Sequence, residues 1–184
     1  WLSAVRIAGP GGMLDEQKMP PCKVLQTIPM TLHPAGRVYD AGQNLSGWAR
    51  IAVQGEAGAE VKLEYAERIT EDGDLDTNFQ DTFIKSGDFQ TDRYILKGSG
   101  GIESWEPRFT YHGFHYVRVS VTGAAEVRSI EARFVGTAFD SIGKITTSDE
   151  TINQLQKMTR WSFRSNFVGI PTDCPHREKN GWTG

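Results

Sequence analysis

The sequence has few cysteines: only Cys22 and Cys174 occur among its 184 residues. They stand near opposite ends of the chain, with neither a CxxC pair nor a histidine cluster beside them. This arrangement excludes a disulfide framework and gives no support to a cysteine zinc site. We therefore expect two free thiols and no bound metal.

Long apolar runs are also missing. No stretch approaches the roughly 20 apolar residues of a membrane helix, and the first residues lack the basic and apolar regions of a signal peptide. The chain begins at Trp1 without a methionine and ends at Gly184 in a polar segment. We expect both ends to be cut ends rather than natural ones, and no membrane as a partner.

Charge of one sign is not concentrated anywhere in the sequence. Twenty basic and 23 acidic residues give a formal net charge of −3, and no run of like charges occurs. Nucleic acids and anionic membranes are recognised through basic patches, so neither is an expected partner, and a neutral ligand fits better. The composition is typical of globular proteins, and the length fits one ordinary domain plus a short piece of another.

The pattern of apolar residues predicts a mainly β domain. Residues 1–23 are rich in glycine and proline, which indicates an irregular lead-in. Alternating apolar and polar residues then recur over residues 24–137, with the clearest cases at 61–65, 117–121 and 130–134. Period two with β-branched and aromatic residues is typical of half-buried strands, and glycine- and aspartate-rich turns lie between them. We predict an antiparallel β-sandwich, with a long loop at 76–88.

The remaining residues, 138–184, predict a linker, one helix and a polar loop. Thr147 and Glu150 have the spacing of a capping box, so the helix should run from about 148 to 166. Its apolar residues fall on one face: Ile152, Leu155 and Met158. Without a partner for this face, the stripe favours self-association of the chain.

The densest polar chemistry lies at residues 172–182. Two carboxylates, Asp173 and Glu178, stand five residues apart, with Arg177 between them and Trp182 after them. A carboxylate can act as a general acid when burial or a second carboxylate raises its pKa, arginine can orient a carboxylate, and an indole offers an apolar platform for a sugar ring. These residues fit a sugar site. A polar segment after a helix is, however, more often a solvated loop than a binding site.

Other polar and aromatic residues have simpler structural interpretations. Asp, Asn and Gly at short spacings more often fix a bend than bind a ligand, as at Asp40, Gly42, Asn44 and Gly47. Large aromatics are more often packed than used as stacking platforms, which applies to Trp48, Trp105 and Trp161. His112 and His115 lie three apart on a predicted strand, hence on opposite faces, and should not share a metal.

The last residues also resemble a known signature. Residues 171–184, PTDCPHREKNGWTG, are similar to the signature of the bacterial α-L-rhamnosidases, glycoside hydrolase family 78. Four earlier stretches resemble the concanavalin-like domain that precedes the catalytic domain in that family: residues 39–48, 65–67, 92–98 and 107–114. Two departures occur in the signature, where His176 replaces the common Gln and Lys179-Asn180 replaces the usual Arg-Leu.

The resemblance implies a fold and an activity. The fold is a concanavalin-like jelly roll followed by a helix that opens a truncated six-fold α/α barrel. The activity is inverting hydrolysis that releases terminal α-L-rhamnose from glycosides or polysaccharides, without a cofactor. A non-catalytic carbohydrate-binding or structural sandwich module is the alternative for the chain itself.

The resemblance also implies roles for individual residues. Glu178 matches the general acid and Asp173 a rhamnose ligand, and Trp182 is expected to bind substrate through its place in the signature. Arg177 is either a further substrate ligand or a partner of the two carboxylates. The general base belongs to the missing part of the barrel, which is the expected partner of this chain, so the chain alone is expected to be inactive.

Overall fold

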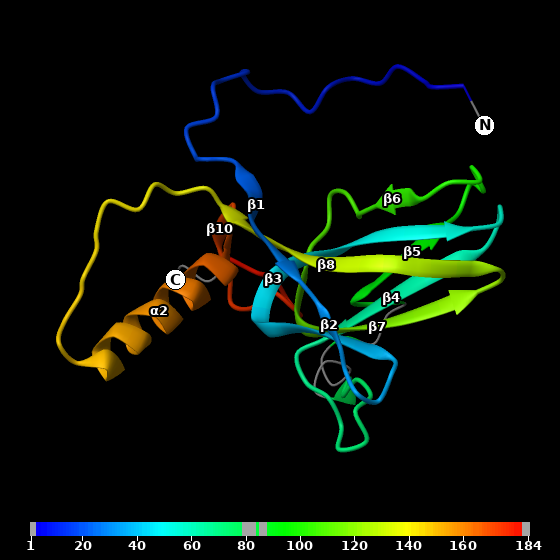
Figure 1. The fold of residues 1–184 in the computed structure, drawn as a ribbon. Helices are drawn as coiled ribbons and strands as arrows, with labels where there is room; N and C mark the ends of the chain where they lie inside the picture. Colours follow the sequence, from blue (N-terminus) through cyan, green and yellow to red (C-terminus); the bar gives the residue numbers. More distant parts are fainter. Residues whose placement is uncertain (1–2, 79–83, 85–87, 182–184) are drawn as a thin grey trace.

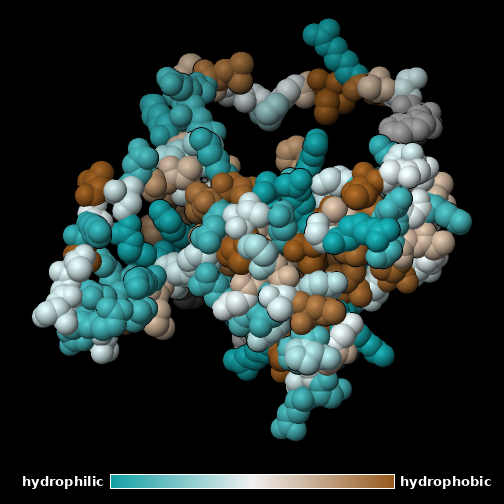
Figure 2. All heavy atoms as spheres, in the orientation of Figure 1, coloured by the Kyte–Doolittle hydropathy of each residue, from teal (hydrophilic) through white to brown (hydrophobic). Residues whose placement is uncertain are grey.

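The computed structural model describes residues 3–78, 84 and 88–181. Part of the predicted long loop therefore lies outside the described residues, as does Trp182. Residues 3–21 form no helix or strand, and Figures 1 and 2 show them as an extended segment running beside the body of the molecule. Several of its apolar side chains are exposed, including Val5, Ile7, Met13 and Leu14.

Ten strands and one helix follow this segment in the described part of the chain (Figure 1). The strands before the helix are β1 (Cys22–Pro29), β2 (Thr31–Leu32), β3 (Val38–Gly55), β4 (Glu60–Ala66), β5 (Thr91–Ile95), β6 (Glu103–Trp105), β7 (His112–Thr122) and β8 (Ala125–Thr137). The helix α2 (Glu150–Ser165) is followed by β9 (Phe167–Val168) and β10 (Ile170–Pro171). Within the described residues, no helix has the length and apolar content needed to span a membrane.

The long strand β3 joins the two layers of the sandwich. Its first part pairs with β7 and β2, and its last part pairs with β8 and β6. The sheet, with strand order β1-β8-β3-β7-β4-β5 and every pairing antiparallel, therefore curls over on itself. This arrangement confirms the predicted mainly β, antiparallel fold.

The bend in β3 comes from the predicted Asp, Asn and Gly residues. The pairing register with β7 shifts between Asp40 and Leu45, and the Gly42 amide donates to the Asp40 carboxylate at 2.6 Å. Gly42 has a φ of 80°, which glycine adopts without steric cost. Gly47 lies so close to β8 that a Cβ would stand 1.8 Å from the Arg133 carbonyl oxygen. The expectation that these residues shape the backbone is confirmed for Asp40, Gly42 and Gly47.

Side chains from both layers fill the core between them. The period-two pattern places alternate residues of β3, β4, β7 and β8 inside, and the largest fully buried ones are Leu45, Ile51, Val53, Val61, Leu63, Tyr65, Phe114, Val117 and Phe134. Each such side chain stabilises the fold by roughly 1.5–3 kcal/mol relative to exposure. The sandwich therefore has a well-packed core, on which the helix and the polar loop that follow it in the chain can pack.

The start of α2 differs from the predicted capping box. Asp149 is the N-cap, and its carboxylate accepts a hydrogen bond from the Thr151 amide at 2.8 Å. The predicted cap, Thr147, lies two residues earlier and donates its hydroxyl to the Asp149 carbonyl. Aspartate caps at least as well as threonine, and the side chain of Asn153, rather than Glu150, accepts from the Thr147 amide at 2.9 Å. The prediction of the capping residue was wrong, although the helix exists.

The helix packs on the sandwich near its C-terminal end. Trp161 stacks on Phe134 with ring centroids 4.2 Å apart, and its indole nitrogen donates to the Asn44 carbonyl oxygen at 2.6 Å. The packing role predicted for Trp161 is confirmed. Towards the start of the helix, Leu155 and Met158 are 61% and 67% exposed, and Figure 1 shows this end pointing away from the strands.

The exposed apolar face of α2 leads to a prediction about self-association. Sedimentation of the 184-residue chain should show concentration-dependent association. Leu155→Lys combined with Met158→Lys should weaken it by about tenfold or more, because each buried apolar side chain contributes roughly 1.5–3 kcal/mol. Ile142→Ala, at an exposed site on the linker before α2, is the control. A monomer at every concentration would contradict the prediction.

Candidate active site

The C-terminal polar segment forms a closed loop after β10. An isolated bridge joins Thr172 to Gly181. Inside it, the Asp173 amide donates to the Asn180 carbonyl oxygen at 3.1 Å, and the Asn180 amide donates to the Asp173 carboxylate at 2.9 Å. These bonds bring the two ends of the loop together, so residues distant by several positions face one another.

The loop gathers three of the four predicted site residues. The Cys174 thiol donates to Glu178 Oε2 at 3.1 Å and to Asp173 Oδ2 at 3.7 Å, and the three side chains offer polar atoms within 4.8 Å of one another. Arg177 Nε lies 3.3 Å from Glu178 Oε2. The fourth predicted residue, Trp182, lies outside the described residues. Asp173, Arg177 and Glu178 thus form one polar cluster.

The backbone of the loop holds Asp173 in its ionised form. Burial alone would raise the pKa of this carboxyl, but hydrogen bonds from the Cys174 and Asn180 amides, with a further one from the Cys174 thiol, outweigh it and keep the pKa below its usual range. Hydrogen bonds to a carboxylate favour the charged form. Asp173 is therefore an acceptor over the whole neutral range of pH.

The residue types of this cluster could bind a metal ion, but its charges disfavour one. Asp173, Cys174 and Glu178 are the residues in the described part of the chain whose ligand atoms lie close enough to share an ion. The guanidinium of Arg177 already places a positive charge beside Glu178. A second cation would have to overcome that repulsion, and we assign no metal to the loop.

The loop rests directly on the sandwich at Gly113 of β7. A Cβ at this position would stand 2.7 Å from the His176 amide nitrogen and 2.7 Å from Pro175 Cγ. A Cβ does not approach a non-bonded atom this closely, so a side chain at Gly113 would displace the loop. Only glycine allows the backbone of β7 and the loop to approach so closely.

A buried polar contact ties the same part of the loop to the sandwich. The imidazole of His176 is buried, and its Nδ1 lies 3.2 Å from Glu67 Oε1 just after β4. Glu67 also accepts from Asn44 Nδ2 at 2.6 Å. Burial would raise the pKa of Glu67, but the hydrogen bonds from His176 and Asn44 lower it overall. Asn44 contacts α2 through Trp161, so helix and loop share one anchor.

Lys179 provides a third attachment. Its ammonium donates to the Tyr111 carbonyl oxygen and lies 4.5 Å from the centre of the Tyr111 ring. Burial lowers the pKa of Lys179, while the charges of Asp92 and Cys174 oppose that shift. Lys179 has a φ of 52°, which a non-glycine residue rarely adopts, so these contacts hold the backbone in an uncommon conformation.

The histidines on β7 make separate contacts. His112 is buried, with Nε2 2.9 Å from Asp92 Oδ2 and Nδ1 3.1 Å from Gln90 Oε1. His115 Nε2 lies 2.9 Å from Asp40 Oδ1. The two imidazoles therefore have different partners, as expected for opposite faces of a strand.

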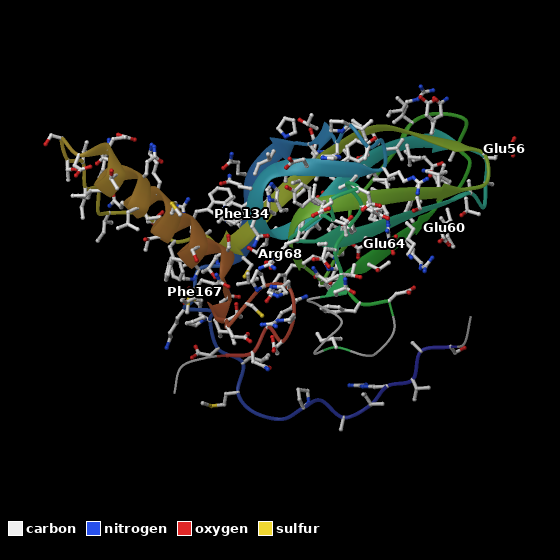
Figure 3. All side chains as sticks on the ribbon, turned by 90° about the horizontal axis from the view of Figure 1, so that it is seen from below. Glu56, Glu60, Glu64, Arg68, Phe134 and Phe167 are labelled. Carbon is white, nitrogen blue, oxygen red and sulfur yellow. The ribbon has the colours of Figure 1, made fainter. Side chains whose placement is uncertain are left out.

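A cleft of about 870 Å³ opens between α2, the bend of β3 and the loop. Asp173, Cys174 and His176 line one side, and Trp161 and Asn44 line others. Figure 3 shows the C-terminal loop following Phe167, which lies just after the helix. Polar groups in a cleft of this volume can hold a small polar ligand.

Sequence reasoning misses the residues that support the loop. The sequence predicts Cys174 only as a free thiol, which it is, yet it contacts both carboxylates. Glu67 and Gly113 fall in two of the stretches that resemble the concanavalin-like domain, and that resemblance is the available signal. Nothing in their local sequence indicates the contacts with the C-terminal loop, because these arise only through the fold.

Glu67 gives a testable pH dependence. Its pKa is lowered in the folded state, so the ionised carboxylate adds stability above its unfolded pKa, and this contribution is lost as the pH falls through the folded value. Glu67→Gln should lower the free energy of unfolding by about 1–3 kcal/mol at neutral pH. The difference in stability between this variant and the wild type should disappear at acidic pH. Urea unfolding at both pH values measures it, with exposed Glu71→Gln as control. A constant difference at every pH would contradict this.

Known protein families match this chain in two consecutive segments. The bacterial alpha-L-rhamnosidase concanavalin-like domain matches residues 30–136, and the bacterial alpha-L-rhamnosidase six-hairpin glycosidase domain matches residues 140–184. An alpha-L-rhamnosidase of Streptomyces avermitilis is 39% identical over 153 residues, which are 82% of this chain and 14% of that protein.

Solved structures agree with these matches. The alpha-L-rhamnosidase from Dictyoglumus thermophilum has a TM-score of 0.79 and 41% identity, over 94% of this chain and 20% of that one. The Streptomyces avermitilis alpha-L-rhamnosidase complexed with L-rhamnose has a TM-score of 0.76 and 36% identity, over 90% and 16%. The chain thus spans a fifth or less of the length of these relatives.

A concanavalin-like sandwich that leads into a six-hairpin glycosidase domain defines a class of glycoside hydrolases. The chain belongs to the bacterial alpha-L-rhamnosidase family. The resemblance seen in residues 171–184 and in the four sandwich stretches is thereby confirmed.

Proposed function

We propose that the protein containing this chain hydrolyses terminal α-L-rhamnosides, with Glu178 as the general acid. The observation that carries the proposal is the loop cluster: Glu178 stands beside Asp173 and Arg177 in a chain of the alpha-L-rhamnosidase family. A general acid must protonate the glycosidic oxygen as the bond to the sugar breaks. The contacts from Cys174 and Arg177 orient the Glu178 carboxyl for this transfer.

In this proposal Asp173 binds the sugar. Its lowered pKa keeps it ionised, and an ionised carboxylate accepts strong hydrogen bonds from hydroxyl groups. Arg177 contacts Glu178 and is proposed as a further ligand of the sugar, and Trp182 is proposed as the apolar platform. The relative from Streptomyces avermitilis, whose structure holds L-rhamnose, supports rhamnose as the sugar.

The general base is proposed to lie outside this chain. An inverting glycosidase separates its two carboxyls by roughly 6.5–9.5 Å to admit a water, whereas Asp173 and Glu178 offer oxygens within 4.8 Å. That gap is nearer to the roughly 5–5.5 Å of a retaining pair. We nevertheless assign Asp173 to sugar binding, as the family resemblance implies, because its carboxylate is held by the Asn180 amide and the Cys174 thiol and keeps further lone pairs for sugar hydroxyls. We therefore keep the inverting mechanism.

The stereochemistry of the product tests this mechanism. Proton NMR during hydrolysis of an aryl α-L-rhamnoside by the full-length protein should show β-L-rhamnose first, followed by slow mutarotation. The 184-residue chain alone should produce no rhamnose, because it lacks the base. Initial α-L-rhamnose, or turnover by the isolated chain, would contradict the proposed division of roles.

The sandwich is proposed to support catalysis structurally rather than by binding the rhamnose. Gly113, Glu67 and Tyr111 all contact the loop that carries Glu178. These contacts favour a positioning role over that of a separate binding module for the scissile sugar.

A further inference from the structure

A second hollow lies on the sandwich, away from the C-terminal loop. It measures about 920 Å³ and is formed by β3, β6 and the segment after β6. Its principal lining residues are Trp48, Arg50, Trp105, Glu106, Arg108 and Phe109. None of them lines the cleft beside Asp173, so this hollow, called here the aromatic groove, is separate from the proposed active site.

Three aromatic side chains line the aromatic groove. Trp48 and Trp105 are half-buried, and Trp105 stacks on Tyr94 with centroids 5.2 Å apart and planes 23° from parallel, which fixes its ring. Phe109 is fully exposed, at 106%, and has a φ of 61°. A bulky residue at positive φ is an outlier, and such outliers gather at ligand sites. The packing predicted for the tryptophans thus leaves part of each indole accessible.

The charges around the groove differ from those of the whole chain, whose net charge is −3. Glu106 is engaged, because it accepts from the Trp48 indole at 2.8 Å and from Arg133 Nε at 3.1 Å. Arg50 is 3.9 Å from Glu131 and its side chain is 42% exposed. Arg108 is exposed and, within the part of the chain that the structure describes, forms no ion pair. The groove therefore presents two accessible guanidinium groups.

We propose that the aromatic groove binds an acidic oligosaccharide. Aromatic faces pack on the C–H faces of sugar rings, and guanidinium groups bind carboxylates through paired hydrogen bonds. A uronate-containing chain offers both features at once. Nucleic acid fits less well, since the surface lacks a continuous basic stripe. The groove then holds a charged part of a polysaccharide, independently of the rhamnose that is cleaved.

Binding to the isolated 184-residue chain tests this proposal. A short oligogalacturonate should quench tryptophan fluorescence and bind in calorimetry, and its methyl ester, which has the same rings without the charge, should bind about tenfold more weakly or worse. Arg108→Gln and Phe109→Ala should each weaken binding of the acid by a similar factor. The matched controls are Arg128→Gln and Ile142→Ala, because both residues are exposed and lie outside the groove.

Three results would overturn the proposal: no binding of the oligogalacturonate, equal binding of the acid and its ester, or equal loss in the variants and controls. If Phe109→Ala instead abolished self-association in sedimentation and left sugar binding unchanged, the groove would be a protein contact. Glu178→Gln should leave binding unaltered, so a failure here is distinguishable from a failure of the proposed catalytic role.

Discussion

Glu178→Gln should reduce kcat of the full-length protein on an alkyl α-L-rhamnoside by about 10²–10⁴-fold. The amide keeps the shape of Glu178 but has no proton to give to the departing oxygen, and general acid catalysis contributes a factor of that size. Rhamnose binding should persist, because Asp173 and its backbone bonds are untouched. The measurement is steady-state kinetics together with calorimetric binding of L-rhamnose.

A matched variant separates this effect from a loss of structure. Glu150→Gln changes an exposed glutamate in the first turn of α2 and should leave kcat within about twofold of the wild type, as most surface substitutions do. Equal kcat in Glu178→Gln and the wild type would remove Glu178 from the mechanism.

Gly113→Ala should release the C-terminal loop, which carries Glu178, from the sandwich. The new methyl group would stand 2.7 Å from the His176 backbone nitrogen, so the loop must move or the strand must bend. Overpacking of this kind costs about 1–3 kcal/mol, which lowers the melting temperature of a chain this long by roughly 2–4 °C per kcal/mol. In the full-length protein, kcat should fall by about 10²-fold, because a displacement near 1 Å has that effect.

Gly143→Ala is the control for this substitution. A Cβ added to Gly143 would meet no atom within 4 Å, and the residue has no positive φ, so alanine there should leave both stability and kcat unchanged. A Gly113→Ala protein with normal activity would show that the loop does not depend on the sandwich for its position. Equal losses in both variants would point to a general intolerance of alanine.

The sequence predicts the architecture because strands leave a local signal. In β4, Val61, Leu63 and Tyr65 are buried while Lys62 and Glu64 lie at the surface side, as their alternation indicates. The bend of β3 is predictable for the same reason, since Asp40 and Gly42 carry turn chemistry within a few residues. The helix is predictable as well, but its cap is Asp149 rather than the predicted Thr147, since neighbouring polar residues compete for the same amides.

The predicted site residues come from a motif rather than from physical pattern. Asp173, Arg177 and Glu178 stand out through their resemblance to a family signature, and spacing alone does not set them apart from a solvated loop. The contacts of Gly113 and Glu67 with that loop are not predictable, because they arise when segments far apart in sequence meet in the fold. The net charge of the whole chain also does not reveal the charge of the aromatic groove, since acidic residues in other parts of the chain outnumber its arginines.

The dependence of rate on the leaving group tests the role of Glu178 most directly. The dinitrophenolate group of a dinitrophenyl rhamnoside leaves as a stable anion without protonation, whereas the alkoxide of an alkyl rhamnoside needs a proton from the general acid. We predict that Glu178→Gln retains most of its kcat on the dinitrophenyl substrate and loses about 10²–10⁴-fold on the alkyl substrate. A loss of the same size on both substrates would contradict the assignment of Glu178 as the general acid.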